Sequence, residues 1–279
     1  MIKVEQLSFG YKRKQAPLFN QFDLSLSLGN IYGLLGQNGA GKSTLLKLLA
    51  GLLVPRKGHI YVGGLTPKAR APQFLREVYL VTEEFYLPPF SIQKFVALYS
   101  PFYPRFSHEA LSNYLQEFGL QPNQKLTGLS YGQKKKFLLS FGLATDCQWL
   151  ILDEPTNGLD IPAKSQFRQV LASAIHDQRS FVISTHQIRD MEALIDPIII
   201  LEQGKLVFHQ SYECMAQKLT MSKQKNLPSD DHLIYAESGL GGYTVVQENT
   251  TQAETNLSLE LLFKAVINNQ EKINQIFNK

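Results

Sequence analysis

The segment of this sequence most able to do chemistry is the glycine-rich run GQNGAGKST at residues 36–44. Gly36 and Gly41 have the spacing of a phosphate-binding loop, and Lys42 and Ser43 complete its pattern. Glycines let the backbone wrap closely around an anion, and the following helix presents its positive N-terminus to the same phosphates. Lys42 can reach the β- and γ-phosphates, while Ser43 offers a hydroxyl to Mg²⁺. The run therefore predicts a nucleotide site, with an ordinary glycine-rich turn as the alternative.

Two carboxylates end the apolar run WLILDE at residues 149–154. A buried strand would place Asp153 beside the glycine-rich run, where it can hold Mg²⁺ through water. Successive side chains of a strand point to opposite sides, so Glu154 points differently and can orient or deprotonate an attacking water. A lone Asp-Glu pair at a strand end is usually a solvated turn. Its combination with the glycine-rich run favours the hydrolytic interpretation.

Further motifs narrow the class of nucleotide enzyme. LSYGQ at 129–133 resembles the signature sequence of ATP-binding cassette (ABC) ATPases, and DEPTNGLD at 153–160 resembles their Walker B and D-loop segment. Thr185-His186 is similar to their switch histidine, and Tyr11 lies where the family stacks an aromatic ring on adenine. The resemblance covers about residues 1–210. It is closest to the ATP-binding subunits of bacterial two-component exporters.

This resemblance implies a dimer that encloses ATP. Ser130 and Gly132 would contact the γ-phosphate of a nucleotide held by a second copy, from the start of a helix. His186 would bind the γ-phosphate and hold Glu154 in place, and Asp160 would line the dimer seam. The dimer would be a homodimer or a heterodimer with a paralogue.

The implied site residues fall into three groups. The cofactor-binding residues are Tyr11, Gly36, Asn38, Gly39, Ala40, Gly41, Lys42, Ser43, Thr44, Ser130, Gly132, Gln133 and Asp160. The catalytic residues are Glu154, His186 and Lys42. The residues for Mg²⁺ are Ser43, Asp153 and Glu83.

The sequence departs from the family pattern at two positions. Tyr131 replaces the usual glycine of the signature, and Glu83 replaces a glutamine that normally contacts Mg²⁺ and water. Glu83 could still coordinate Mg²⁺, with extra negative charge. The aromatic and proline-rich run at 85–90 suits a hydrophobic socket for a membrane partner, with a packed loop as the alternative. Lys134–Lys136 are expected on a solvated helix face.

Strands alternate with helices along the chain, which predicts a mainly parallel sheet covered on both faces. The expected class is an α/β P-loop NTPase core with an antiparallel β subdomain, a helical subdomain at about 91–145 and a small C-terminal α+β extension. The ABC domain is expected at 1–210 and the accessory extension at 211–279. Helices are expected at 43–53, 161–177, 187–195 and 257–279, and a hairpin at 232–248. Strands are expected at 1–9, 22–28, 31–35, 58–64, 78–82, 149–152, 181–184 and 198–201.

The composition limits the function classes. The 279 residues carry a net charge of +4, which is too mild and dispersed to imply nucleic acid. The two cysteines lie far apart and suit a reducing compartment. No apolar run reaches the ~20 residues of a membrane span, so a separate integral membrane permease is expected as the partner, with this chain peripheral at the cytoplasmic face of the inner membrane.

The predicted function is therefore an ATPase subunit that uses ATP and Mg²⁺ to drive a permease, with export favoured over import. The alternative is a soluble non-transport ABC ATPase, such as an iron–sulfur assembly ATPase. A small-molecule P-loop kinase would not explain residues 129–133 or His186.

Overall fold

The computed structural model describes residues 1–12, 14–228, 231–251 and 255–277. Its centre is a six-stranded sheet in which the strands are parallel, except that the last is antiparallel to its neighbour. The strand order is β5 (Val78–Val81), β6 (Trp149–Asp153), β7 (Ser180–Thr185), β3 (Ile31–Leu35), β8 (Ile198–Glu202) and β9 (Lys205–Gln210). The mainly parallel sheet expected from the sequence is confirmed.

Apolar cores lie on both faces of this sheet, because the strands are apolar at nearly every position. In β6, Ile151 belongs to one core, while Leu150 and Leu152 belong to the other. Helix α1 (Lys42–Leu49) packs in the first core, and α6 (Ile161–Ala174) packs in the second. Burial on both faces fixes the register of the strands, and with it the positions of the loops at their ends.

A second, antiparallel sheet covers the first core. Its strands are β2 (Phe19–Leu26), β1 (Ile2–Phe9) and β4 (Lys57–Val62), in that order. Alternate residues of β2 are buried, including Phe22, Leu24 and Leu26, which is the pattern of a sheet with one solvated face. A short helix, α2 (Pro72–Leu75), follows this sheet.

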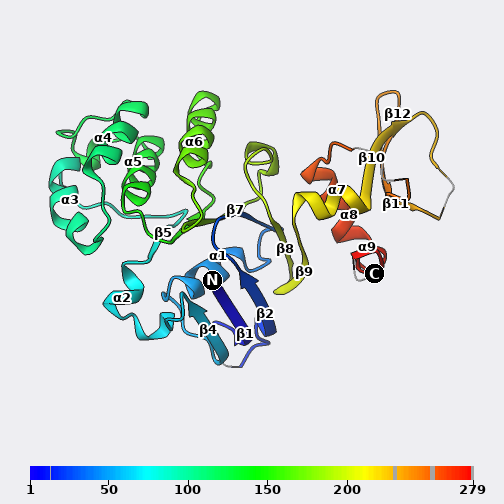
Figure 1. Cartoon of the computed structure of the whole chain (residues 1–279), viewed down its shortest axis with the longest axis horizontal. Coiled ribbons are helices and arrows are strands. Elements are labelled where there is room, and N and C mark those ends of the chain that lie inside the picture. The colour runs from blue at the N-terminus through cyan, green and yellow to red at the C-terminus, as the bar shows by residue number, and fades with distance from the viewer. Residues whose placement is uncertain (13, 229–230, 252–254, 278–279) are drawn as a thin grey trace.

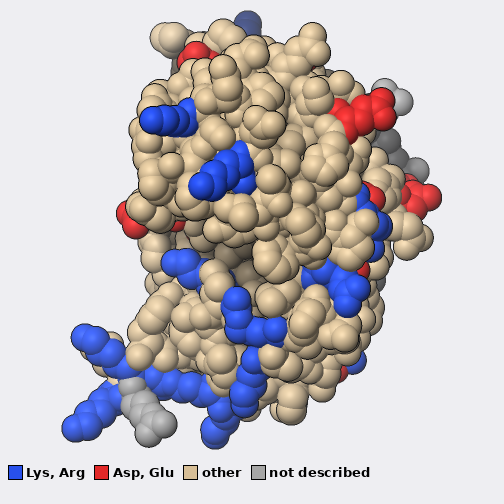
Figure 2. All heavy atoms as spheres, turned by 90° about the vertical axis from the view of Figure 1, so that its left-hand side faces the viewer, with Lys and Arg blue, Asp and Glu red and all other residues tan. Residues whose placement is uncertain are grey.

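Helices α3 (Ile92–Tyr99), α4 (His108–Glu117) and α5 (Tyr131–Ala144) follow β5. They form the block on the left of Figure 1, next to α6. Phe95, Phe137 and Phe141 pack edge to face inside this block, with ring centroids 5.1 and 5.2 Å apart from Phe95. Figure 2 shows the outer face of this side of the molecule, where Lys and Arg lie mainly over the lower half.

The C-terminal residues lie on the opposite side of the central sheet (Figure 1). They form α7 (Tyr212–Lys218), a sheet of β10 (Leu219–Gln224), β12 (Gly242–Glu248) and β11 (Leu233–Gly239), and helices α8 (Leu259–Asn268) and α9 (Gln270–Phe277). Arg189 forms an ion pair with Glu260 of α8 at 2.5 Å, so this extension contacts the segment that follows His186. The division of the chain at residue 210 stays a prediction.

Two helix predictions were wrong in detail. The helix expected at 187–195 is a short 3-10 turn, Ile188–Asp190, followed by further turns; Ile188, Met191 and Ile195 are buried without a continuous helix. The helix expected at 257–279 is interrupted at Asn269, whose non-helical backbone, with φ −140° and ψ 50°, ends α8 before α9 begins; residues 278–279 of this prediction lie outside the described residues. Among the described residues, none of the helices combines the length and the apolar character that a membrane span requires.

Candidate functional site

The glycine-rich run forms the loop between β3 and α1, at the carboxyl end of the central sheet. Gly39 and Gly41 have positive φ angles of 85° and 109°, a region that residues with a Cβ rarely adopt. Gly36 lies against β8, because a Cβ there would be 2.6 Å from the carbonyl oxygen of Leu201. The sequence therefore needs glycine at these positions to form a loop whose backbone N–H groups can face an anion.

Lys42 lies inside this loop at the start of α1. Its Nζ donates to the carbonyl oxygens of Gly36 at 2.7 Å and Gln37 at 3.4 Å, and it lies 3.9 Å from Oε1 of Glu154. Burial lowers the pKa of Lys42, while the nearby carboxylates of Glu154, Asp153 and Glu83 act to raise it. The loop therefore holds a buried ammonium where phosphate oxygens would need it.

Ser43 and Asp153 meet although they lie 110 residues apart. Ser43 Oγ donates to Asp153 Oδ1 at 3.1 Å, and Ser184 Oγ from β7 donates to the same oxygen at 2.5 Å. A hydroxyl and a carboxylate are the oxygen ligands that Mg²⁺ takes beside phosphate oxygens and water. No cluster of three His, Cys, Asp or Glu side chains occurs among the described residues. The donor set therefore fits Mg²⁺ that arrives with a nucleotide, rather than a metal held by protein alone.

Glu154 follows Asp153 with a left-handed backbone, φ 47°, and is only 5% exposed. Its Oε1 lies 2.9 Å from Nδ1 of His186, and its Oε2 accepts the backbone N–H of His186 at 3.3 Å. His186 follows β7, which is the fourth strand after the glycine-rich loop in sequence but pairs with β3 in the sheet. This geometry orients the carboxylate as a general base requires.

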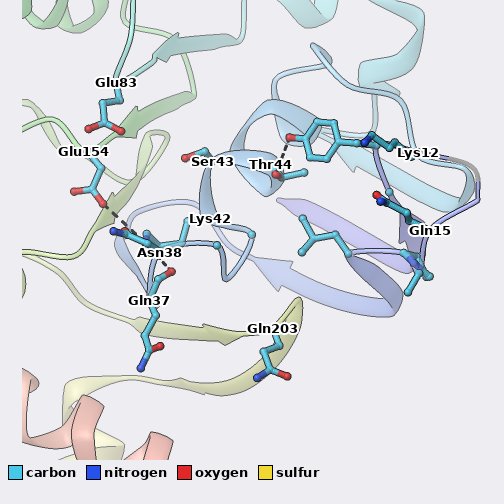
Figure 3. Close-up of a pocket in the computed structure, with 17 residues that line it drawn as sticks. Lys12, Gln15, Gln37, Asn38, Lys42, Ser43, Thr44, Glu83, Glu154 and Gln203 are labelled. Carbon is cyan, nitrogen blue, oxygen red and sulfur yellow. Dashed lines mark hydrogen bonds and ion pairs between the residues drawn. The ribbon is translucent and has the colours of Figure 1, made fainter.

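A cavity of about 680 Å³ opens over the loop. Figure 3 shows Glu83, Glu154 and Lys42 at one end of it, and Lys12 and Gln15 at the other. The predicted site residues that line the cavity are Tyr11, Asn38, Gly39, Gly41, Lys42, Ser43, Thr44, Glu83 and Glu154. Gln37, Gln203, Lys12 and Gln15 also line it. Gln203, Lys12 and Gln15 could not be identified from the sequence, because they belong to no motif.

Tyr11 lies at this cavity and is 66% exposed. Its hydroxyl is 2.9 Å from Thr44 Oγ1, and its ring meets Phe9 edge to face at 5.2 Å. Phe9 itself is buried in the core, so Tyr11 is the aromatic ring of this pair that is available to a nucleobase. Ala40 and Asp153 lie buried beneath the cavity and do not line it.

The signature residues lie elsewhere. Ser130 caps α5: its Oγ accepts from the N–H of Gln133 at 3.3 Å, and Gln133 Oε1 accepts from the N–H of Ser130 at 2.9 Å. This reciprocal pair is a capping box. Asp160 caps α6 by accepting from Ala163 N–H at 2.9 Å. Neither Ser130, Gly132, Gln133 nor Asp160 lines the nucleotide cavity of the same chain.

Glu83 joins a set of polar side chains that the sequence analysis did not identify. Its Oε1 accepts from Asn157 Nδ2 at 2.8 Å, and Asn157 Oδ1 accepts from Gln187 Nε2 at 2.8 Å. The hydroxyl of Tyr131 donates to the backbone oxygen of Glu83 at 2.7 Å. These bonds connect the loop after β5 with the segments that follow β6 and β7 and with the start of α5.

The expectation of a solvated lysine face at Lys134–Lys136 was wrong for Lys135. This side chain is 3% exposed, and its Nζ donates to the backbone oxygen of Glu154 at 2.5 Å. Helical geometry explains the error, because Lys135 faces inward with the apolar side of α5 while its neighbours are half-buried. The run of three lysines hides this difference in the sequence.

The chain is similar to known ABC proteins. A family model described as ABC transporter matches residues 19–157. The chain is 26% identical to the ABC transporter ATP-binding protein NatA of Bacillus subtilis (strain 168), over 74% of this chain and 87% of that protein. It is 34% identical to the Nod factor export ATP-binding protein I of Burkholderia orbicola (strain AU 1054), over 67% of this chain; the match spans 64% of that relative, less than two thirds of its length.

A solved structure shares the fold. It is a dimeric ATP-binding cassette in a post-hydrolysis state with ADP and Pi, 23% identical, with a TM-score of 0.66. The match covers 76% of this chain and 98% of that one.

Proposed function

Because the chain belongs to the ABC transporter family as an ATP-binding subunit, we propose that it hydrolyses ATP as a dimer and thereby drives a separate membrane permease, in the direction of export. The observation that carries this proposal is the buried carboxylate of Glu154. It lies 2.9 Å from His186 and 3.9 Å from Lys42, at the end of a cavity that can hold a nucleotide.

The chemistry is phosphoryl transfer to water, which depends mainly on positioning and charge stabilisation. Lys42 and the loop N–H groups neutralise charge on the phosphates, and Tyr11 stacks on the base. Ser43 and Asp153 would hold Mg²⁺, which supplies further charge neutralisation at the phosphates when it is bound. Glu154 accepts a proton from the attacking water or orients it, and His186 fixes the direction of that carboxylate.

A second copy is required for the signature residues to act. Ser130 is exposed at the start of α5 and does not line the cavity of its own chain, so it can reach a γ-phosphate only from a partner. Ile161, beside Asp160, is 85% exposed, which suits a surface that is covered in a dimer. Each ATP would then join the loop of one chain to α5 of the other.

The direction and partner are inferred from the relatives. The relative that is 34% identical is named as an export protein, so export is the direction we propose. The alternative, a soluble iron–sulfur assembly ATPase, is not favoured, because the reported relatives are transporter or export proteins. The chain would bind its permease at the cytoplasmic face of the membrane, with Tyr86, 85% exposed, at the contact.

Size-exclusion chromatography with ATP tests the dimer. Glu154→Gln removes the base but keeps the shape of the side chain, so it should trap ATP and elute as a dimer with ATP and as a monomer with ADP. In this background Ser130→Ala should weaken the dimer about tenfold or more for each of its two sites, because each site loses one hydrogen bond to a charged group.

Ser107→Ala is the matched control. Ser107 caps α4 in the same way, accepting from Ala110 N–H at 3.1 Å, so both variants lose a cap worth about 1 kcal/mol. An ATP-bound Glu154→Gln chain that stays monomeric, or equal losses from both serines, would count against the proposed dimer.

A further inference from the structure

Lys135 is a buried cation that the mechanism above does not use. Its stem lies among apolar side chains of the second core, including Val81, Leu152 and Leu159. Burial lowers the pKa of its ammonium from 10.5 to about 8, against the opposing effects of Glu83, Glu154 and Asp153. A lysine placed in an apolar pocket costs stability unless its charge is paired, so its position needs a reason.

The contact of Lys135 is with the backbone of the proposed base. Its Nζ donates to the carbonyl oxygen of Glu154 at 2.5 Å. On the other side of the same residue, the N–H of Glu154 donates to Ser184, to the carbonyl oxygen and to Oγ at 3.1 Å each. A non-glycine residue with φ 47° is unfavourable and persists only when its surroundings hold it. Lys135 and Ser184 therefore hold the backbone that directs the carboxylate.

The charge of Lys135 is also matched to its surroundings. The same three carboxylates act on Lys135 and on Lys42, but the effect of Glu83 is the largest of the three on Lys135 and the smallest on Lys42. When a nucleotide binds, Lys42 would be committed to phosphate and Asp153 to Mg²⁺, which leaves Lys135 to balance Glu83 and Glu154. The ring of Tyr131 covers it, with Nζ 5.4 Å from the ring centroid, and the Tyr131 hydroxyl binds the backbone of Glu83.

From these contacts we infer that Lys135 is a positioning residue for hydrolysis: it holds the backbone of Glu154 and balances the charge that Glu83 adds to the site. The inference rests on the proposed role of Glu154 as the base. It also explains why two unusual residues, Glu83 and Tyr131, occur around the same ammonium.

Steady-state ATPase kinetics test the inference on the purified full chain. Lys135→Met keeps the apolar stem and removes the ammonium, so kcat should fall about 100-fold, as for a small misplacement of a catalytic group, while KM for ATP stays within about twofold. Lys135→Arg retains a charged donor and should recover kcat to within about tenfold of the wild type.

Lys136→Gln is the matched control. Lys136 is the next residue of the same helix, but its Nζ lies over the Phe118 ring, 5.8 Å from the ring centroid, and not at the backbone of Glu154. It should retain wild-type kcat. Equal kcat in Lys135→Met and Lys136→Gln would overturn the inference, and so would a Lys135→Arg variant no more active than Lys135→Met. If Lys135→Met does not fold, as judged by thermal unfolding, Lys135→Gln takes its place: it also removes the charge, so it should lower kcat while KM for ATP stays within about twofold.

The charge balance has its own test. Adding Glu83→Gln to Lys135→Met removes the acid together with its counter-charge, so Glu83→Gln should raise kcat about tenfold more in the Lys135→Met background than it does in the wild type, as expected for residues that are electrostatically coupled. The same factor of change from Glu83→Gln in both backgrounds would overturn the role assigned to Glu83. A wild-type chain without ATPase activity would refute the proposed function itself, whereas an active wild type with an indifferent Lys135 would refute only this inference.

Discussion

At Glu154, one backbone dihedral decides where the carboxylate points. Strand β6 ends with Asp153 directed at Ser43, and the left-handed turn at the next residue directs Glu154 towards His186 instead. Neighbouring acids can thus have separate roles, one at the metal position and one at the water. Ser184 contributes to both, because its Oγ bonds Asp153 and accepts from the N–H of Glu154.

Glu83 carries the most specific prediction at the residue scale. Glu83→Gln should raise kcat for ATP by up to about tenfold, because it removes a negative charge beside the phosphates and Gln can still accept from Asn157. Steady-state ATPase rates with saturating Mg²⁺ would measure this. Glu84→Gln is the control, since Glu84 is exposed and lies next in the chain without lining the cavity. A Glu83→Gln variant without activity would contradict the prediction.

At the scale of elements, the segment after β5 has two kinds of aromatic residue. Phe85 stacks on Tyr131 with ring centroids 5.3 Å apart and packs against the core, whereas Tyr86 points outward. Phe85 therefore belongs to a packed loop, while the partner socket expected at residues 85–90 stays a prediction that the exposed Tyr86 allows to be tested. The stack of Phe85 on Tyr131 also connects this segment to the start of α5, next to the signature residue Ser130.

Tyr86 allows this surface to be tested. Tyr86→Ser should reduce the fraction of chain that co-purifies with its membrane partner about tenfold, because an exposed aromatic anchor of an interface typically contributes over 1 kcal/mol. KM for ATP should not change. Leu240→Ser, at the tip of the hairpin between β11 and β12, is the control of similar exposure. Equal retention of the partner by both variants would exclude the proposed contact.

At the scale of the whole molecule, the nucleotide cavity and the signature residues belong to different surfaces of one chain. The chain alone thus has half of each proposed site, and the proposed dimer would complete two sites at once. The extension on the far side of the sheet contacts the segment after His186 through Arg189 and Glu260, at a cavity of about 560 Å³ that Gln37 and His186 also line. The extension is therefore in contact with the segment that follows the proposed catalytic residue His186.

Co-purification tests the proposed assembly. A tagged chain expressed in its own organism should retain, from detergent-solubilised membranes, a second protein with several apolar spans of about 20 residues. Mass spectrometry of the eluate would identify it. A tagged Lys42→Ala chain should retain the same protein, because Lys42 lies in the nucleotide site and away from the proposed contact. Recovery of the chain without any membrane protein would contradict a transport role.

The sequence by itself predicted the fold class, the resemblance to ABC ATPases and the conformation of the glycine-rich loop. These features are local: glycines, a lysine and a hydroxyl in one run bind phosphate wherever a strand leads into them and a helix follows. The comparisons support the function expected from those motifs, an ATPase subunit of an ABC transporter. The roles of individual site residues and the boundary at 210 stay predictions.

Only the tertiary structure decided which distant residues meet. Asn157 binds Glu83 across 74 positions of sequence, and Lys135 turns inward to Glu154 while its neighbours Lys134 and Lys136 do not. Composition and spacing assign the same character to all three lysines, because burial depends on how α5 is rotated against the sheet. That rotation follows from core packing on both faces of the helix block, which is a property of the whole chain and of no single segment.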